Sequence, residues 1–269
     1  MSSGSSKSGS QNSEPVPDRR SADIGFVCTH RGEMKPFLKR VDRQRSYSEG
    51  RITIRGGFLG ELVRLVIAEA GVGYAQHRAA TELLLDEHHP SWVLCVGFSS
   101  ALSPDLQAGD LVVANEIADT HGNSLPVKCT IGARKRIHVG KLLVADKHPE
   151  TPEEKKRFAE SSGALAVDTT SLAVAQVCTE KNVRLVVVRA IIDAAEEQVP
   201  DNAASMIFRP DSKSVGTAIG SLFRGLRGMS ELNNWRIRSA EAASNLDRFV
   251  AGLVEQISDI IERRKYGAL

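Results

Sequence analysis

Residues 151–193 read TPEEKKRFAESSGALAVDTTSLAVAQVCTEKNVRLVVVRAIID, and this stretch decides the fold. It opens with a helix start, because Thr151 can serve as N-cap, Pro152 stands at the first helical position and Glu154 is the capping-box acid. Three further elements are expected after this helix: a strand at 164–167, a helix at 170–182 and a strongly apolar strand at 183–193. Helices and strands therefore alternate, and the strands have the continuous apolar pattern of strands that are buried on both faces.

The same alternation extends to both sides of this stretch. The preceding part of the chain predicts strands at 24–29, 92–97, 110–117 and 141–146, a β-rich start to 61–73, and helices at 32–41 and 74–88. From about residue 214 the pattern is helical, with one apolar face formed by Leu232, Trp235, Ala243, Leu246, Phe249, Val250, Leu253, Ile257 and Ile260. We predict an α/β fold, with a mixed, mostly parallel sheet flanked by helices, in a single domain over residues 23–269.

Composition limits the possible partners. The chain has 269 residues, of which 41% are hydrophobic and 25% charged, and this is enough to bury the core of one large domain. A net charge of +2 gives no reason to expect binding to nucleic acid or to an anionic membrane.

Residues 1–22 are rich in Ser and Gly and predict a disordered tail. Because the chain shows neither a signal-peptide pattern nor an apolar run of membrane-spanning length, we expect a cytoplasmic protein without a membrane span.

The four cysteines, Cys28, Cys95, Cys129 and Cys178, are scattered and form no CxxC pair. Three of them lie within apolar runs, where a free cysteine behaves as a small hydrophobic residue. We therefore expect no disulfide framework and no zinc site, and neither a metal ion nor a cofactor enters the predicted site.

Polar or otherwise unusual residues follow four of the predicted strands, and in open α/β sheets ligands bind beyond the carboxyl ends of the strands. These residues are Glu33, then Phe98, Ser99 and Ser100, then Asp168, Thr169 and Thr170, and finally Asp193. A carboxyl group at the end of a buried strand is costly to desolvate unless a partner or a task holds it there. We expect the four clusters to surround a single cavity in which Glu33 and Asp193 form an acid–base pair, at least one of them with a raised pKa.

Each of these residues also has a purely structural interpretation. Asp193 could cap a loop or a helix, and Glu33 could be a solvated acid in the first turn of a helix. The Gly71–Gly73 turn could offer its amides to a phosphate or be a plain turn before a helix. His88 and His89 lie in a polar segment and are expected to be solvated.

Four stretches together resemble the nucleoside phosphorylase/nucleosidase superfamily. They are GVGYAQHRAATELLL, VGFSSALSPDLQAGDLVVANEI, TPEEKKRFAESSGALAVDTTSLAVAQVC and VVVRAIIDAAEEQVP, in this order. The resemblance is greatest to the methylthioadenosine/adenosylhomocysteine nucleosidases and the hopanoid-associated phosphorylase-like proteins. It implies that Asp193 corresponds to the aspartate that protonates N7 of a leaving purine, and that Glu33 corresponds to the glutamate that activates water.

At the positions that form the ribose site and the turn in that family, this sequence has different residues. Phe98 stands where the family has a small residue, and Thr169 and Thr170 stand where it has a Met-Glu pair whose glutamate binds the ribose hydroxyls. Asp168 lies one residue upstream of that pair. Two interpretations remain: an enzyme that cleaves the N-glycosidic bond of a nucleoside or related ribosyl compound, or a binding protein on the same fold that has lost turnover.

The nucleophile and the assembly are also open at this point. Phosphate would need cationic or amide donors, for which Arg31, Arg55 and Gly73 are the candidates, whereas Glu33 would repel phosphate and favours water. The resemblance also implies a homo-oligomer. Candidate contact surfaces are the apolar stretch Leu59, Leu62 and Val63 and the face of the helix that starts at Tyr74, although both could equally belong to the core.

Overall fold

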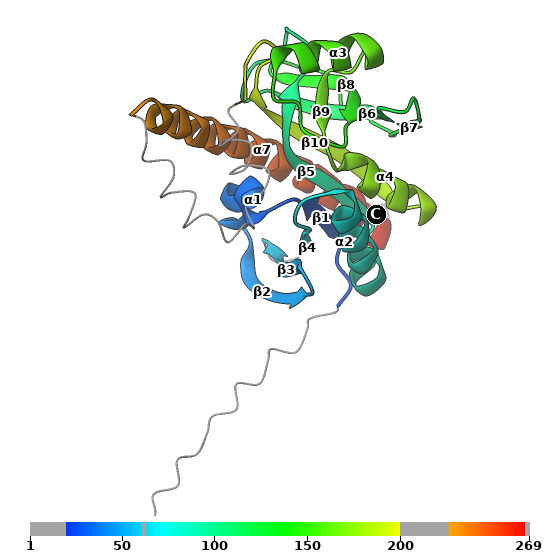
Figure 1. Ribbon diagram of the computed structural model, residues 1–269. Helices are drawn as coiled ribbons and strands as arrows, with labels where there is room; N and C mark the ends of the chain where they lie inside the picture. The colour runs from blue at the N-terminus through cyan, green and yellow to red at the C-terminus, as the bar shows by residue number, and fades with distance from the viewer. Residues whose placement is uncertain (1–19, 61–62, 200–225, 267–269) are drawn as a thin grey trace, which may run out of the picture.

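The computed structural model describes residues 20–60, 63–199 and 226–266 (Figure 1). Its strands are β1 (Ile24–Cys28), β2 (Asp42–Glu49), β3 (Ile52–Leu59), β4 (Val63–Glu69), β5 (Trp92–Ala101), β6 (Leu111–Asp119), β7 (Ser124–Pro126), β8 (Ile137–Val144), β9 (Ala166–Asp168) and β10 (Arg184–Asp193). Its helices are α1 (Arg31–Leu38), α2 (Tyr74–His88), α3 (Pro152–Ser162), α4 (Ser171–Glu180) and α7 (Leu226–Tyr266). The mixed α/β sheet flanked by helices is confirmed.

The strands form one sheet in the order β10-β6-β8-β9-β5-β1-β4-β3-β2, with β7 paired to β6. Parallel pairs join β4, β1, β5 and β10 in the centre, and β6, β8 and β9 are parallel to one another. Because β5 also pairs with β10, the strands β10, β6, β8, β9 and β5 close into a ring. The carboxyl end of β5 therefore lies between two neighbours, β10 and β9.

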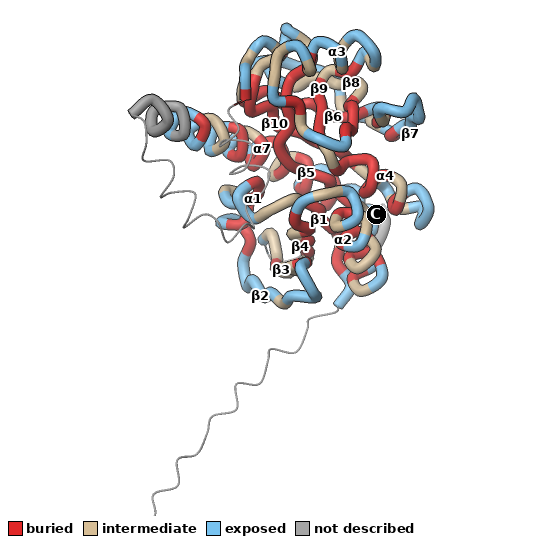
Figure 2. The backbone as a smooth tube through the Cα atoms, in the orientation of Figure 1, coloured by how far each residue is buried: buried red, intermediate tan, exposed pale blue. Residues whose placement is uncertain are grey.

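Different helices cover the two faces of the sheet. On β1, Phe26 packs in a cluster with Phe37 of α1 and Trp235 of α7, whereas the next residue, Val27, packs with α2 and α4 on the other face. Figure 1 shows α1 on one side of the central strands and α2 and α4 on the other, and Figure 2 shows that these strands are buried. Burial on both faces explains the continuous apolar runs of β1, β5 and β10.

The hairpin of β2 and β3 was not predicted. Seven of the eight side chains of β2, in the sequence DRQRSYSE, are exposed, so its residues carry no apolar periodicity that would reveal a strand. Its partner β3 contains Gly56 and Gly57. A Cβ on Gly57 would come within 2.4 Å of Val41 Cγ1, so this close approach of the chain requires glycine.

The boundary of the expected N-terminal tail needs a small correction, although residues 1–19 lie outside the described residues. Ala22 is only 7% exposed and donates its N–H to the His88 carbonyl at 2.7 Å. The expectation of a solvated His88 is wrong, because this side chain is buried and its Nε2 lies 3.1 Å from the Tyr47 hydroxyl. His89, by contrast, is exposed as expected.

Helix α7 packs the apolar face that its sequence predicts. Seven of the nine positions of this face are buried, while Ile260 is exposed and the side chain of Leu232 lies outside the described ones. Arg40 of the α1–β2 turn binds Asp247 with both its Nε and Nη2, at 2.6 and 3.0 Å, and so anchors the helix. Helix α7 is long but charged along its length, and no helix in the described part of the chain could cross a membrane.

Replacing Thr151 with alanine is expected to lower the free energy of unfolding by about 1 kcal/mol. Thr151 Oγ1 accepts from the Glu154 N–H at 3.2 Å, and Glu154 Oε2 accepts from the N–H groups of Glu150 and Thr151. Urea unfolding measures the loss. Thr151→Ser keeps the hydroxyl and should cost much less, so equal losses in the two variants would contradict this role.

Candidate active site

Three of the four polar strand-end clusters meet at one small cavity. Its lining residues are Thr29, Glu33, Val72, Gly73, Phe98, His148, Asp168, Thr169, Thr170 and Arg189, and its volume is about 20 Å³. This is room for about one water molecule. Asp193, the fourth expected member, is not among these residues and its side chain is 0% exposed, so the expectation of a single cavity that contains both acids is wrong.

Glu33 is held at this cavity by the backbone. It is the third residue of α1, and its Oε2 accepts from the N–H groups of Thr29 at 2.7 Å and His30 at 3.3 Å. Its Oε1 accepts from the N–H of Phe98 on β5 at 3.2 Å. Glu33 is only 4% exposed, so the interpretation as a solvated helix acid is wrong, although its capping role is real. Three amide donors keep the carboxylate in one position beside the cavity.

Asp193 lies at the end of β10 and is 0% exposed. Its Oδ1 accepts from the Ser100 hydroxyl at 2.6 Å, and its Oδ2 lies 2.5 Å from Nζ of Lys155, which is buried as completely. Lys155 also donates to the carbonyls of Ala194 and Glu197, each at 2.7 Å. Burial raises the pKa of Asp193 to about 6, and the nearby Lys155 and Ser100 limit this rise. The expectation of a raised pKa is confirmed for this acid.

His148 connects this buried pair to the surface of the pocket. Its Nε2 lies 2.5 Å from Ser100 Oγ, the same atom that donates to Asp193, and its ring lines the small cavity. Burial and the charge of Lys155 lower the pKa of His148 to about 3, so the ring is neutral at physiological pH. Sequence reasoning did not single out His148 or Lys155, because their roles arise from contacts between distant segments.

Arg189, which lines the small cavity, forms a second buried charge cluster. Its Nε pairs with Asp168, its Nη2 donates to Ser171 Oγ at 2.7 Å and Thr170 Oγ1 at 3.1 Å, and the residue is 1% exposed. Asp168 Oδ1 also accepts from the N–H groups of Thr170 and Ser171, at the start of α4. Asp168 therefore has two structural roles: it pairs with the Arg189 guanidinium and it accepts hydrogen bonds from the N-terminus of α4. A charged residue in the apolar strand VRLVVVRAIID was the available signal for Arg189.

The remaining expected ligand residues divide into two groups. Thr169 and Thr170 line the small cavity, and Phe98 narrows it as expected, with its ring 6.2 Å from the ring of His30 in an edge arrangement. Ser99 is fully buried and does not line the cavity, whereas Ser100 reaches it only through His148. Binding roles for these residues stay predictions.

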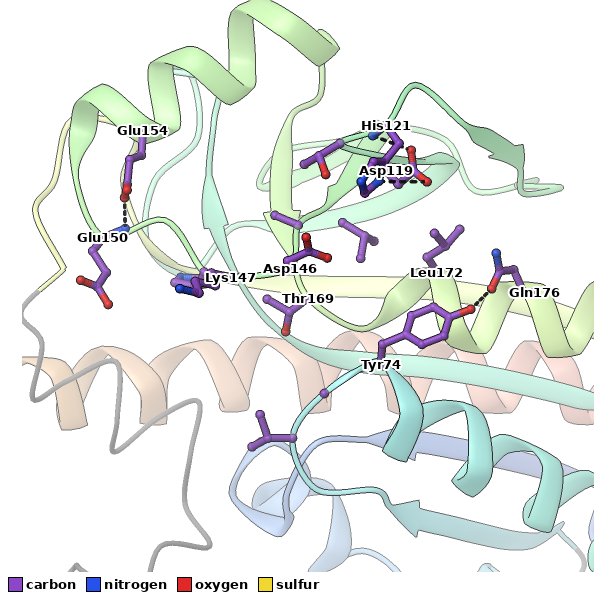
Figure 3. A pocket seen from close by; sticks show the side chains of 16 residues that line it. Tyr74, Asp119, His121, Asp146, Lys147, Glu150, Glu154, Thr169, Leu172 and Gln176 are labelled. Atoms are coloured by element: carbon purple, nitrogen blue, oxygen red, sulfur yellow. Dashed lines mark hydrogen bonds and ion pairs between the residues drawn. The ribbon is translucent and has the colours of Figure 1, made fainter.

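A larger pocket of about 730 Å³ adjoins the small cavity, and the two share Val72, Gly73, His148 and Thr169. Figure 3 shows Asp146 and Thr169 near its centre, with Tyr74 and Gln176 on one side and Glu150 and Glu154 on the other. Its described lining contains four carboxylates and one lysine: Asp119, Asp146, Glu150, Glu154 and Lys147. This volume can accept a nucleoside with an additional substituent.

The three candidate phosphate residues are not brought together. Gly73 lines both cavities with its backbone in the left-handed region at a φ of 101°. Arg55 lies on β3 and pairs with Glu69 at 3.0 Å, and Arg31 is exposed on α1; neither lines the pocket or the small cavity. The acidic lining of the larger pocket also opposes an anionic nucleophile.

Replacing His77 with glutamine is expected to make the protein less sensitive to acid. His77 is fully buried on α2, its Nδ1 lies 3.1 Å from the Gly73 carbonyl, and burial lowers its pKa to about 4. The folded state resists protonation of this ring, so its contribution is complete above pH 6.5 and is lost as pH falls through 4. The loss should amount to about 3 kcal/mol. Urea unfolding between pH 4 and 7.5 measures it, and parallel curves for the two proteins would exclude it.

The chain matches one known protein family over most of its length. The model of the family described as "Phosphorylase superfamily" matches residues 23–136 and 128–224. This protein belongs to the phosphorylase superfamily. The matched ranges contain Glu33, the β5 end, Asp168–Thr170 and Asp193.

Within the phosphorylase superfamily, similar curated proteins include two nucleosidases. The 5'-methylthioadenosine/S-adenosylhomocysteine nucleosidase of Maridesulfovibrio salexigens is 22% identical over 201 residues, which cover 65% of this chain and 87% of that protein. The protein of the same name from Staphylococcus aureus is 22% identical over 198 residues, covering 64% of this chain and 86% of its own length.

Solved structures of the superfamily share the fold. The 5'-methylthioadenosine/S-adenosylhomocysteine nucleosidase of Helicobacter pylori with butyl-thio-DADMe-Immucillin-A has a TM-score of 0.63 at 17% identity, covering 86% of this chain and 99% of that one. The futalosine hydrolase of Helicobacter pylori has a TM-score of 0.62 at 17% identity, covering 85% and 97%.

Proposed function

We propose that this protein hydrolyses the N-glycosidic bond of a purine nucleoside or a related ribosyl compound. The observation that carries the proposal is Asp193, a fully buried carboxyl group whose pKa is raised to about 6 at the carboxyl end of β10. A carboxyl group with such a pKa is protonated in roughly one molecule in ten at pH 7, compared with about one in a thousand for an ordinary aspartate. It can therefore act as a general acid toward the leaving base.

Glu33 supplies the second half of the reaction in this proposal. Its carboxylate faces a cavity with room for about one water molecule, and its orientation is fixed by three backbone amides. A carboxylate in that position can accept a proton from water as the water attacks the sugar carbon. The small volume and the acidic lining of the adjoining pocket favour water over phosphate as nucleophile.

The relatives support the same chemistry. Two of the named homologues are nucleosidases of 5'-methylthioadenosine and S-adenosylhomocysteine, and one structural neighbour is a futalosine hydrolase. These names describe those proteins. For this chain they favour a substrate with a purine-type base and a ribosyl group, and the 730 Å³ pocket leaves space for a substituent beyond the sugar.

A second candidate function is ligand binding without turnover. It is favoured by the ion pair of Lys155 with Asp193, which occupies one oxygen of the acid, and by Thr169 and Thr170, which offer hydroxyls in place of a carboxylate at the sugar positions. In this case a ribosyl compound or purine should raise the melting temperature although no base is released.

One experiment separates the two candidates. The purified protein is incubated with adenosine, inosine, methylthioadenosine, adenosylhomocysteine and futalosine, with and without phosphate, and free base is measured by chromatography. Hydrolysis predicts release that does not depend on phosphate. If no compound is cleaved but one of them stabilises the protein, the binding function is correct. In that case Thr170→Glu combined with Phe98→Ser should introduce turnover, because it restores the carboxylate and a small residue.

We also expect a cytoplasmic homo-oligomer. Leu59 and Val63 pack partly against the main core cluster, which accounts for part of their apolar character, and Leu62 lies outside the described residues. Tyr74 is 41% exposed and is the better candidate for a contact between subunits. Light scattering at micromolar concentration should give a multiple of 29.1 kDa, and a mass of one chain would exclude the oligomer.

A further inference from the structure

Asp193 has no direct access to a ligand in the described structure. Its side chain is completely buried and lines neither the small cavity nor the 730 Å³ pocket. A proton held there must therefore pass through other groups before it reaches a leaving base. The groups in contact with Asp193 Oδ1 and Oδ2 define the available path.

Two side chains form a continuous path of short hydrogen bonds from Asp193 to the pocket. Asp193 Oδ1 lies 2.6 Å from Ser100 Oγ, and Ser100 Oγ lies 2.5 Å from His148 Nε2. The His148 ring lines both cavities. Ser100 and Asp193 are opposite one another in the β5–β10 pairing, and the register shifts at Ile192. This irregularity directs Asp193 toward Ser100.

We propose that Ser100 and His148 relay the proton of Asp193 to the leaving group, so that His148 is the catalytic residue that contacts the base. The proposal rests on the proposed hydrolysis of an N-glycosidic bond. Ser100 contacts only Asp193 and His148 in this path and is a positioning and relay residue.

Each proton in the proposed step moves between neighbouring groups. Before reaction, the Asp193 O–H donates to Ser100, the Ser100 O–H donates to His148 Nε2, and the ring carries its proton on Nδ1. The ring gives that proton to the base while Nε2 takes the serine proton and the serine takes the proton of Asp193. The C–N bond breaks as water attacks, and Glu33 receives the proton of that water. Asp193 ends as a carboxylate and His148 as the other neutral tautomer.

The surroundings of the three residues suit this transfer. His148 must be neutral to donate with one nitrogen and accept with the other, and its lowered pKa keeps it so. Lys155 Nζ lies 2.5 Å from Asp193 Oδ2, the oxygen that does not face Ser100. It can stabilise the buried carboxylate that remains after the proton has left. Its two bonds to the carbonyls of Ala194 and Glu197 hold it there.

The first test does not depend on activity. In the full-length protein labelled with ¹⁵N-histidine, the proposal predicts that the neutral His148 ring changes from the Nδ1–H to the Nε2–H tautomer as pH rises through the ionisation of Asp193, near pH 6. The change should disappear in Asp193→Asn and in Ser100→Ala. His148→Gln identifies the signal. If the wild-type ring keeps one tautomer from pH 4.5 to 8, or if Ser100→Ala still shows the change, the relay is wrong.

The second test uses kinetics on the best substrate from the nucleoside panel. His148→Gln and Ser100→Ala should each lower kcat by about 10²–10⁴-fold with little change in KM. Combining either with Asp193→Asn should add little further loss, because the residues act as one unit. His89→Asn changes an exposed histidine whose backbone is left-handed, a conformation that asparagine tolerates, and should leave kcat unchanged. Losses that multiply in the double variants would overturn the relay.

The two proposals fail in different ways. If the wild-type protein cleaves no nucleoside, the proposed hydrolysis fails whatever the histidine tautomer does. If it cleaves a nucleoside while His148→Gln and Ser100→Ala retain full kcat, the hydrolysis stands and the relay fails.

Discussion

Replacing Asp193 with asparagine is expected to lower the rate of base release by about 10²–10⁴-fold. The change removes the only proton of the side chain that can be donated to a leaving base at neutral pH, and it alters the shape of the buried site very little. In the wild type, kcat should fall as pH rises above about 6, because the reactive form of Asp193 is the protonated one and its pKa is raised to about 6. Initial rates from pH 5 to 9 measure both effects.

The asparagine variant also changes stability, and this must be separated from the chemistry. Lys155 is completely buried and would lose its carboxylate partner, at a cost of about 3–5 kcal/mol. The double variant Asp193→Asn with Lys155→Met removes both charges and should recover much of that stability while remaining inactive. A well-folded double variant that releases base at the wild-type rate would rule out Asp193 as the proton source.

Replacing Arg189 with methionine is expected to destabilise the fold strongly, with a loss of about 3–5 kcal/mol. Arg189 is 1% exposed, and the variant would leave the Asp168 carboxylate in the core without its cation. The hydroxyls of Thr170 and Ser171 would each lose a donor as well. Urea unfolding at pH 7 gives the free energy of unfolding of each variant.

Two further variants test the cause of that loss. Asp168→Asn in the Arg189→Met background should restore part of the stability, because the unpaired charge is gone. Gly97→Ala should be destabilising through the same cluster, since a Cβ there would lie 2.2 Å from Arg189 Nη1 and 2.8 Å from Glu33 Oε1. Gly252→Ala, where a Cβ meets nothing within 4 Å, is its matched control. If the methionine variant unfolds at the same urea concentration as the wild type, the ion pair contributes nothing to stability.

The sequence predicts an element correctly where its apolar periodicity and its capping residues indicate the same bounds. Helix α2 begins at Tyr74 and ends at His88, as expected, and α3 starts at its predicted capping box. In contrast, β2 consists of exposed polar residues and owes its strand conformation to pairing with β3, which no local pattern reveals. The closure of β5 onto β10 likewise depends on contacts between residues that lie about 90 positions apart.

The sequence predicts those site residues that lie at or directly after the carboxyl ends of strands. That rule predicts that Glu33, Phe98 and Thr169 lie at one cavity, and all three line it in the structure. It did not show that Asp193 lies behind the cavity, because the depth of a side chain depends on the register shift at the end of β10. Lys155 and His148 come from the α3 region, and only the folded chain brings them to Asp193 and Ser100.

The ring of strands has a consequence for how this protein tolerates substitutions at the end of β5. The backbone of residues 97–101 is paired on one side with β10 and, at its end, on the other side with β9. Its path is therefore fixed by main-chain hydrogen bonds and is largely independent of the side chains that it carries. A substitution at Phe98 or Ser100 should therefore change the shape and polarity of this edge while the backbone keeps its path. This edge of the sheet is a rigid frame on which single side chains can be exchanged.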